Sequence, residues 1–213
     1  MMTETCMREE LIGVCRRLDG AGLIAATDGN VSCRLAADRI LITPSGTRKA
    51  ELTPLDLVLV DLNDGSVIAG QGRASSESLM HFLVYRRRPD VMAVVHAHPP
   101  LLTAYTLAGM PFRADVLPEV WLTIGPVPTA PYATPTTEEL ANSIDPLIEH
   151  HQAILLERHG SVTFGCNLKE ACMRLEKLEH AAHTLLYSSL LAGRPPKSLS
   201  KAALRQLATL LGK

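Results

Sequence analysis

The sequence predicts a single α/β domain over residues 1–213, with a central, mainly antiparallel sheet flanked by helices. Two observations support this fold class. Short segments rich in Val, Ile and Leu, separated by turn residues, dominate residues 31–70, and most segments with helical spacing follow them. The length of 213 residues suits one sizeable core, and no internal repeat, low-complexity tract or domain linker divides the chain.

Seven segments have the apolar, β-branched character of strands. Turn residues such as "TPSG" and "LNDG" separate the early segments and indicate antiparallel hairpins. "VMAVVH" and "AILLE" are short, uninterrupted apolar runs, which are typical of buried strands. The predicted strands cover residues 31–35, 39–43, 57–61, 66–70, 91–96, 153–157 and 161–165.

Apolar spacing and capping residues predict the helices. Ser75 or Ser76 is the expected N-cap of the second helix, and Pro89 follows its end. Thr136 followed by Glu139 has the spacing of a capping box. The predicted helices cover residues 5–19, 76–88, 99–109, 136–149 and 168–191, the last capped by Asn167. Residues 193–213 form either a terminal helix or a tail that docks on a neighbouring subunit.

Composition and charge exclude several classes of protein. Hydrophobic residues make up 46% and charged residues 20%, as in a folded soluble protein, and the net charge of −1 favours neither nucleic acid nor a membrane as partner. Five scattered cysteines without a CxxC pair indicate reduced, structural thiols. Without a signal-peptide core or a run of 18 apolar residues, the expected location is the cytoplasm.

Three histidines follow apolar strands. His96 and His98 end the run "VVHAH", and residues two apart on a strand point to the same face. His159 ends a second apolar strand, with Gly160 allowing a tight turn. Two imidazoles aimed at one point suit zinc, and a third gives the open three-ligand site of catalytic zinc. The alternative is a chance strand end with solvated or hydrogen-bonded imidazoles.

Glu77 would lie in the first turn of a helix, next to amides and hydroxyls that can bind an anion. Taken alone, this carboxylate could simply complement the helix dipole. His81, one turn later, is expected to pack against the helix surroundings or lie on the surface. The remaining histidines, expected to be structural, are His150, His151, His180 and His183.

Three turns have the composition of a phosphate-binding cradle. "TDGNVS", "TPSGT" and "SSE" each combine small or hydroxyl residues with turn or helix-start geometry. Together their amides and hydroxyls could hold a dianion without a basic patch. The candidate residues are Gly29, Asn30, Ser45, Gly46, Ser75 and Ser76.

The ordered motifs "GNVS", "TPSG", "SSE", "HAH", "PYAT" and "RHG" resemble the class II aldolase/adducin family, and its L-fuculose-1-phosphate aldolases most of all, from about residue 7 to residue 192. The resemblance implies that His96, His98 and His159 hold Zn²⁺ or another divalent metal. It implies that Glu77 is the catalytic acid/base and can approach the metal without substrate. The three turns would bind the substrate phosphate, and the protein would be a homotetramer with its site at the subunit interface.

One segment departs from the family pattern. The fuculose-phosphate enzymes use a tyrosine of a neighbouring subunit as proton donor, and the matching segment here, "VLPEVWLTIG", contains none. Glu119 or Trp121 falls near that position, and only the carboxyl group of Glu119 is a suitable donor. Related pentulose-phosphate epimerases carry aspartate where this chain has Glu77, which favours carbon–carbon bond cleavage.

The resemblance therefore implies a lyase that reversibly cleaves a ketose 1-phosphate to dihydroxyacetone phosphate and an aldehyde. A sugar-phosphate dehydratase or decarboxylase, or an aldolase for a methylthio- or deoxy-pentulose phosphate, is the nearest alternative. A non-catalytic module like the adducin head is disfavoured because all three histidines and Glu77 are present. For proton transfer near neutral pH, we expect a raised pKa for Glu77.

Overall fold

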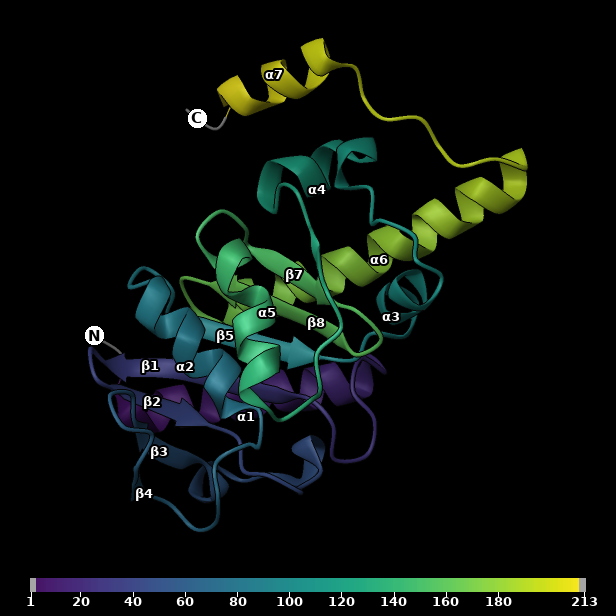
Figure 1. Cartoon of the computed structure of the whole chain (residues 1–213). Helices are drawn as coiled ribbons and strands as arrows, with labels where there is room; N and C mark the ends of the chain where they lie inside the picture. The colour runs from purple at the N-terminus through teal and green to yellow at the C-terminus, as the bar shows by residue number, and fades with distance from the viewer. Residues whose placement is uncertain (1–2, 211–213) are drawn as a thin grey trace.

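Eight strands form one sheet in the computed structural model, which describes residues 3–210 (Figure 1). The strand order is β4-β3-β2-β1-β5-β8-β7-β6, and all pairs are antiparallel except β6 with β7. The strands are β1 Asn30–Ala36, β2 Arg39–Ile42, β3 Val58–Asp61, β4 Val67–Ala69, β5 Ala93–Ala97, β6 Thr129–Ala130, β7 Ala153–Leu156 and β8 Gly160–Gly165.

Helices cover both faces of this sheet and confirm the predicted α/β class (Figure 1). The α-helices are α1 Glu4–Gly20, α2 Ser78–Arg87, α3 Pro100–Leu107, α4 Pro118–Thr123, α5 Glu138–Ile148, α6 Leu168–Ala192 and α7 Lys201–Leu210. Three short 3₁₀ segments are η1 Lys49–Glu51, η2 Pro54–Asp56 and η3 Ala114–Val116.

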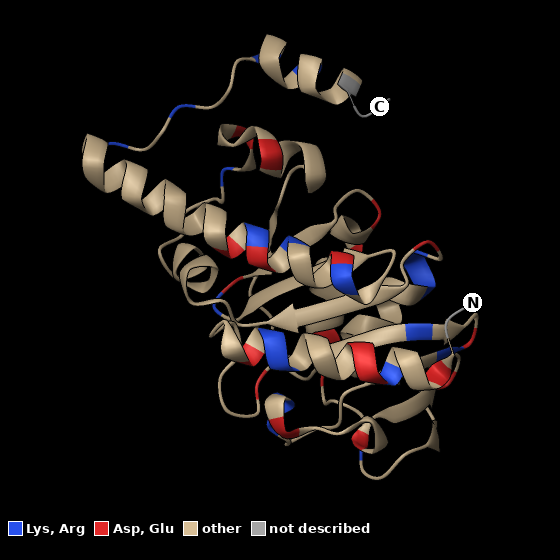
Figure 2. Cartoon of the chain, turned by 180° about the vertical axis from the view of Figure 1, so that it is seen from behind, with Lys and Arg blue, Asp and Glu red and all other residues tan. Residues whose placement is uncertain are grey.

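The core lies in two layers, one on each side of the sheet. One layer packs α1, α3 and α6 against apolar side chains such as Val31, Val95 and Leu155. The other packs α2 and α5 against side chains such as Val94 and Ile154. Adjacent strand residues thus point to opposite layers, as the twofold alternation of a strand requires. Figure 1 shows α2 and α5 in front of the sheet, and Figure 2 shows α1 and α6 on the other side.

Several predicted helix starts differ from those in the structure. The N-cap of α2 is Glu77 rather than Ser75 or Ser76, so Glu77 precedes the first helical turn. The N-cap of α5 is Thr137, with no side-chain capping bond, and Thr136 has a left-handed φ of 69°. The predicted capping box is therefore wrong, because Thr136 belongs to the preceding turn. The Asn167 cap of α6 is confirmed, since its side chain accepts a hydrogen bond from the Glu170 amide.

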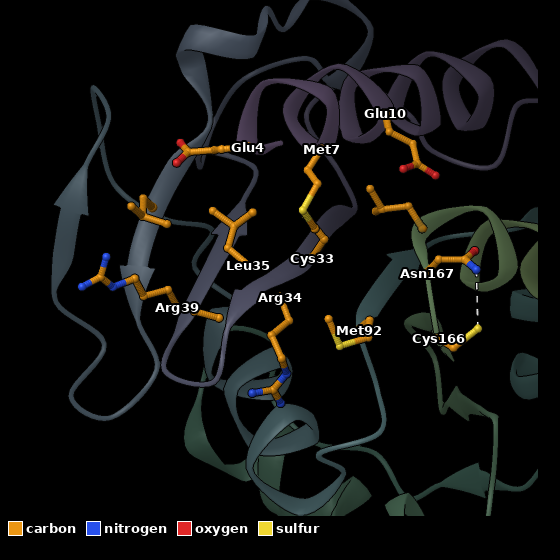
Figure 3. Close-up of a pocket in the computed structure, with 13 residues that line it drawn as sticks. Glu4, Met7, Glu10, Cys33, Arg34, Leu35, Arg39, Met92, Cys166 and Asn167 are labelled. Atoms are coloured by element: carbon orange, nitrogen blue, oxygen red, sulfur yellow. Dashed lines mark hydrogen bonds between the residues drawn. The ribbon is translucent and has the colours of Figure 1, made fainter. Parts of the chain in front are cut away.

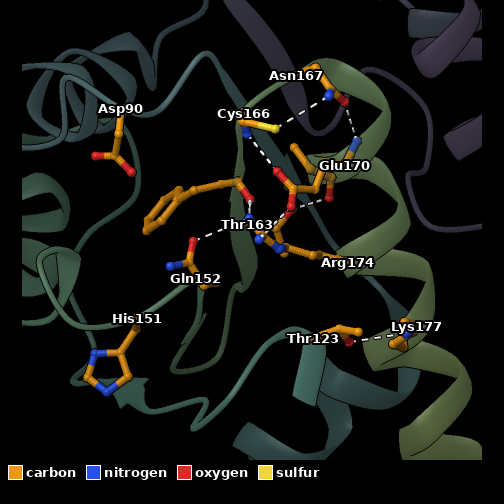
Figure 4. A network of polar contacts seen from close by, with 12 residues as sticks. Asp90, Thr123, His151, Gln152, Thr163, Cys166, Asn167, Glu170, Arg174 and Lys177 are labelled. Atoms are coloured by element: carbon orange, nitrogen blue, oxygen red, sulfur yellow. Dashed lines mark hydrogen bonds and ion pairs between the residues drawn. The ribbon is translucent and has the colours of Figure 1, made fainter. Parts of the chain in front are cut away.

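Polar contacts anchor the start of α6 on the sheet (Figure 4). The Arg174 guanidinium donates to the Gln152 side chain and to the Phe164 carbonyl, and it pairs with Glu170 one turn earlier. The Glu170 carboxylate also accepts a hydrogen bond from the Cys166 amide. These contacts fix the end of β8 relative to α6.

The C-terminal segment forms helix α7, which lies beside α4 and away from the sheet (Figure 1). The Leu199 amide donates to the Asp115 carbonyl, and Arg113 donates to the Ser198 hydroxyl. Among the two alternatives for residues 193–213, the structure has a helix at Lys201–Leu210. Docking on a neighbouring subunit stays a prediction. No helix within residues 3–210 combines the length and apolar character needed to cross a membrane.

A cavity of about 470 Å³ lies between the start of α1 and the far end of β1, away from Asn30 (Figure 3). Its lining is largely apolar and includes Met7, Cys33 and Met92, with Glu4 and Arg39 among its charged residues. Charges of both signs alternate along α1 on this side of the molecule (Figure 2).

Candidate metal centre

The pairing of β5 with β8 brings the three predicted histidines together. In this antiparallel pair Ala97 lies opposite Ser161, so the end of β5 meets the start of β8. His96 lies within β5 and His98 directly follows it, while His159 lies in the tight turn between β7 and β8. Their ring centroids are 4.8–4.9 Å apart, and the Nε2 atoms of His96 and His98 are 3.0 Å apart.

Gly160 is required here for close approach rather than for turning. The left-handed residue of the β7–β8 turn is Arg158, with φ 59°. A Cβ atom on Gly160 would lie 2.4 Å from the Ala97 carbonyl oxygen and 2.8 Å from the His98 ring. Real Cβ contacts are never this short, so only glycine lets β8 start against the end of β5. The sequence pointed to Gly160 as a residue that matters for the site, but the expected reason, a tight turn at Gly160 itself, was wrong.

Glu77 completes the cluster from the opposite side. One carboxylate oxygen is 3.1 Å from His96 Nε2, and the other is 3.2 Å from His159 Nε2. One donor atom each from Glu77, His96, His98 and His159 lies within 4.8 Å of all the others. Glu77 and His96 are buried, and the other two histidines are half-buried. The structure therefore gathers the four predicted ligand side chains at one point.

The four side chains fit a metal ion in both chemistry and spacing. Ligands at about 2.1 Å from a tetrahedral zinc lie about 3.4 Å apart, close to the observed 3.0–3.2 Å separations. His96 Nδ1 donates to the Ser161 carbonyl at 3.0 Å, which leaves Nε2 as the atom that faces the other ligands and can bind a metal. Asp28 lies 3.5 Å from His98 Nδ1 on the outer side of that ring.

Burial and neighbouring charges shift the pKa values of His98 and Glu77 in this cluster. Burial, together with the charges of the neighbouring His96 and His159, lowers the pKa of His98 to about 4. For Glu77, burial favours the neutral acid, but the charge and hydrogen bonds of His96 and His159 outweigh it and hold its pKa below the usual range. The expected raised pKa of Glu77 was therefore wrong, because its nearest neighbours are hydrogen-bond donors.

A cavity of about 420 Å³ adjoins the cluster and is lined by all three predicted cradle turns. A bridge between Pro44 and Ala74 holds two of these turns together, and the third directly precedes β1. Glu77, His98 and His159 open onto the same cavity. The cradle residues that line it are Gly29, Asn30, Ser45, Gly46, Ser75 and Ser76.

Lys49 is a cavity residue that the sequence did not reveal. Its ammonium donates to the Thr27 carbonyl at 2.7 Å and to the Thr47 carbonyl at 2.8 Å, although the residue is only 2% exposed. Burial lowers its pKa, while the carboxylates of Asp28 and Glu77 are among the groups that raise it. Lys49 thus links two cradle turns and places a cation at the cavity. Its position three residues after the "SG" turn is the only signal available in the sequence.

A family model described as the class II aldolase and adducin N-terminal domain matches residues 9–186. The chain belongs to the class II aldolase/adducin family. This membership confirms the resemblance expected from the ordered motifs, and the match includes every cradle turn and all four clustered side chains.

Class II aldolase relatives with different activities are similar to this chain. It is 34% identical to the 5-deoxy-D-ribulose 1-phosphate aldolase of Bacillus thuringiensis serovar kurstaki over 190 residues, covering 88% of this chain and 87% of the relative. It is 31% identical to the 3-oxo-tetronate 4-phosphate decarboxylase of Escherichia coli K12 over 208 residues, 96% of each chain. A solved L-fuculose 1-phosphate aldolase superposes with a TM-score of 0.89 at 29% identity, covering 100% of this chain and 99% of that one.

In this class II aldolase fold His81 packs inside the domain, the first of its two expected placements, and does not lie on the surface. Its side chain is fully buried, with Nε2 2.5 Å from Asn30 Oδ1 and Nδ1 2.7 Å from the Ser32 hydroxyl. Asn30 in turn donates to Glu77 at 2.9 Å. His81 therefore packs inside the domain and connects to the candidate site through Asn30, a partner that lies 51 residues away in sequence.

Two expected site residues do not join this class II aldolase cavity within one chain. Glu119 lies exposed in the first turn of α4, and Trp121 lies on the same helix, lining a different cavity with Leu204. Neither residue lines the cavity beside the histidines. The assignment of Glu119 as a proton donor stays a prediction that requires a neighbouring subunit.

Proposed function

We propose that this protein is a metal-dependent aldolase that reversibly cleaves a ketose 1-phosphate, similar to L-fuculose 1-phosphate, into dihydroxyacetone phosphate and an aldehyde. One observation carries the proposal: three histidines and Glu77 form one cluster, of which Glu77, His98 and His159 line a cavity that small, hydroxyl-rich turns also line. A metal centre beside an anion cradle suits a substrate with a phosphate next to its reacting carbonyl. An adducin-like binding module would need neither the ligands nor their convergence.

The cradle would bind and orient the substrate phosphate. Backbone amides of the three turns and the hydroxyls of Ser45, Ser75 and Ser76 would donate to the phosphate oxygens, with Lys49 supplying the buried positive charge. Holding the phosphate in a fixed position sets the reacting carbons against Glu77 and the histidines. The binding energy of the phosphate, which lies away from the broken bond, would thus be used to orient the substrate.

His96, His98 and His159 would hold the metal, and their borderline imidazole nitrogens suit Zn²⁺ among divalent ions. When bound, the ion supplies a Lewis acid that polarises the substrate carbonyl and stabilises negative charge on its oxygen. Breaking the bond between carbons 3 and 4 converts the carbon 4 hydroxyl into an aldehyde and leaves an electron pair at carbon 3. Glu77, ionised in the substrate-free protein, would take up a proton from water when substrate binds and deliver it to carbon 3. Glu119 of a neighbouring subunit would take the carbon 4 hydroxyl proton and return it to water.

We further propose a homotetramer with the site at the subunit interface. Apolar side chains near the end of α6 remain strongly exposed in the single chain, including Leu190 at 70% and Leu191 at 90%. Glu119 is also exposed and would need a second chain to reach a cavity. Sedimentation equilibrium should give a mass of four chains, and a monomer at micromolar concentration would contradict this arrangement.

Decarboxylation of a 3-oxo acid phosphate is the second candidate. The similarity to the 3-oxo-tetronate 4-phosphate decarboxylase covers 96% of this chain, and the segment that carries a tyrosine in the fuculose-phosphate enzymes lacks one here. Loss of carbon dioxide leaves negative charge beside a carbonyl, as aldol cleavage does, so the same metal ligands serve both reactions. The difference is the leaving group.

Product analysis on three substrates separates these functions. Metal-replete protein would be incubated with L-fuculose 1-phosphate, 5-deoxy-D-ribulose 1-phosphate and 3-oxo-tetronate 4-phosphate. Detection of dihydroxyacetone phosphate from either ketose 1-phosphate supports the aldolase. Faster cleavage of the deoxy substrate than of L-fuculose 1-phosphate would indicate that the protein is a deoxy-pentulose-phosphate aldolase. Carbon dioxide released from the third substrate alone would overturn the aldolase proposal in favour of the decarboxylase.

A further inference from the structure

A continuous chain of buried polar side chains runs from the interior of the domain to Glu77. The Tyr85 hydroxyl is 2.8 Å from the Ser32 hydroxyl, and Ser32 is 2.7 Å from His81 Nδ1. His81 Nε2 is 2.5 Å from Asn30 Oδ1, and Asn30 Nδ2 donates to Glu77 Oε2 at 2.9 Å. The first four residues are at most 3% exposed, and Glu77 is 8% exposed.

The fold explains why these residues meet. Asn30 lies opposite His96 in the β1–β5 pair, at the edge of the metal cluster. Ser32 follows two residues later on the same face of β1, and His81 and Tyr85 lie one turn apart on α2. Glu77 is the N-cap residue of that same helix. One face of α2 therefore runs along one face of β1, and polar groups line their contact.

The ionised carboxylate fixes the direction of every hydrogen bond in the chain. Glu77 can only accept, so the NH₂ end of the Asn30 amide faces it and the Oδ1 end faces His81. Oδ1 also only accepts, so His81 must carry its proton on Nε2. His81 Nδ1 then accepts from the Ser32 hydroxyl, and Ser32 accepts from Tyr85. All donors point toward Glu77.

A neutral imidazole with its proton on Nε2 satisfies every hydrogen bond of this chain in the direction just given. Protonation of the ring would make Nδ1 a donor and reverse the hydrogen bond to Ser32. In the other neutral tautomer, the lone pair of His81 Nε2 would face a lone pair of Asn30 Oδ1, and the two atoms would repel each other. Burial, together with the charge of His96, lowers the pKa of His81 to about 3. The group therefore stays neutral in the working range of an ordinary enzyme.

We propose that His81 is a positioning residue, which holds the Asn30 amide in the one orientation that donates to Glu77 and so sets the Glu77 carboxylate against the metal ligands. This inference rests on the proposed role of Glu77 in proton transfer. A freely turning Asn30 would present its carbonyl oxygen to the carboxylate, repel it and release it from the position between His96 and His159.

The first test reads the tautomer of His81 in the wild-type, zinc-loaded protein and needs no activity. Long-range ¹H–¹⁵N spectra of histidine-labelled protein would be assigned by comparison with His81→Phe. The expected signature is a protonated Nε2 and an unprotonated, hydrogen-bonded Nδ1 from pH 6 to pH 8. An unprotonated Nε2 would overturn the proposal. If wild-type protein shows no lyase activity, the proposed function fails while this measurement still decides the geometry.

The second test separates positioning from packing by kinetics. His81→Phe fills the same space without the hydrogen bond and should lower kcat by about tenfold to a hundredfold, with KM and zinc content within about threefold of wild type. His81→Gln, which keeps one donor and one acceptor, should recover part of kcat. Met80→Leu changes the neighbouring buried residue of α2, outside the chain of hydrogen bonds, and should leave kcat unchanged.

Two outcomes would contradict the positioning role. One is an unchanged kcat in folded, zinc-loaded His81→Phe. The other is an equal loss of kcat in His81→Phe and Met80→Leu, which would indicate general disturbance of the helix. If His81→Phe fails to fold, Ser32→Ala removes the donor to His81 Nδ1 with a smaller change of volume, and it should shift the His81 ¹⁵N resonances and lower kcat in the same direction.

Discussion

Glu77 is the residue on which the proposed chemistry depends most. Its two carboxylate oxygens contact His96 and His159, and Asn30 donates to one of them. Replacing Glu77 by Gln keeps the size of the side chain and removes its proton-transfer group. We expect Glu77→Gln to bind one zinc per chain and to lose about a hundredfold or more in kcat. Turnover and metal content would be measured on the same preparation.

A matched control is Glu138→Gln, which alters an exposed carboxylate in the first turn of α5. This variant should keep wild-type kcat and metal content. If Glu77→Gln kept full activity, Glu77 would have no role in proton transfer. If the variant lost zinc together with activity, the main role of Glu77 would be to bind the metal.

Lys49 supplies the clearest prediction about binding at the residue scale. Its ammonium bonds to Thr27 and Thr47 and lies at the cavity that would receive the phosphate. Lys49→Met removes a charge-assisted interaction, and we expect KM to rise by about tenfold or more with kcat within about threefold. Inhibition by inorganic phosphate should weaken in parallel. Lys169→Met, on the exposed first turn of α6, serves as control, and equal KM values in both variants would contradict the role of Lys49.

The contact between β5 and β8 is the element that builds the metal site. At Gly160, a Cβ atom would overlap the Ala97 carbonyl and the His98 ring. We expect Gly160→Ala to lower the free energy of unfolding by about 1–3 kcal/mol and to weaken zinc binding, because His98 must move. Urea unfolding and zinc titration would measure the two effects.

Gly13→Ala is the matched control for this glycine. Gly13 lies on the exposed side of α1, and a Cβ there meets nothing within 4 Å. Alanine in a helix interior should raise the free energy of unfolding by about 0.5–1 kcal/mol. If Gly160→Ala behaved like Gly13→Ala, the close approach of the two strands would not matter for the site.

Local patterns predicted most strands and α-helices but missed the strand β6 and the α-helix α4, as well as the three short 3₁₀ segments. The strands rich in Val and Ile and the long helices carry strong periodicity, and the structure contains them at nearly the predicted residues. β6 has only Thr129 and Ala130, and it forms because the chain passes beside β7. α4 has six residues and begins at Pro118, too short for a periodic signal. Tertiary contacts, which a window of sequence does not contain, decide such elements.

Site residues were predictable where a motif ends an element and unpredictable where partners come from afar. His96, His98 and His159 end apolar strands, so their convergence followed from strand alternation. Lys49 and His81 bind groups on distant turns and strands, and neither has a local pattern. The pKa of Glu77 was mispredicted for the same reason, because its direction depends on the donors beside it.

At the scale of the whole molecule, buried histidines couple stability to pH. The pKa of His81 falls from 6.5 to about 3 and that of His98 from 6.5 to about 4, both mainly through burial. The unfolded chain therefore binds protons that the folded chain does not. The metal-free protein should lose stability as pH falls below about 6.5, by about 1.4 kcal/mol per pH unit for each group that titrates only in the unfolded state.

Denaturant unfolding of metal-free protein at several pH values between 7 and 4 would measure this slope. His81→Phe should have a shallower slope than wild type, because one such group is removed. Equal slopes in the two proteins, or a free energy of unfolding that stays constant from pH 7 to pH 4, would show that these histidines are protonated in the folded state.

Metal dependence of cleavage tests the central claim most directly. Purified protein would be stripped with a chelator and titrated with Zn²⁺, while formation of dihydroxyacetone phosphate from a ketose 1-phosphate is followed. We expect cleavage to vanish on stripping and to return in proportion to zinc, reaching its maximum at about one ion per chain, as a single site predicts. Stripped protein that cleaves the substrate at the rate of the untreated protein would contradict a catalytic metal at His96, His98 and His159.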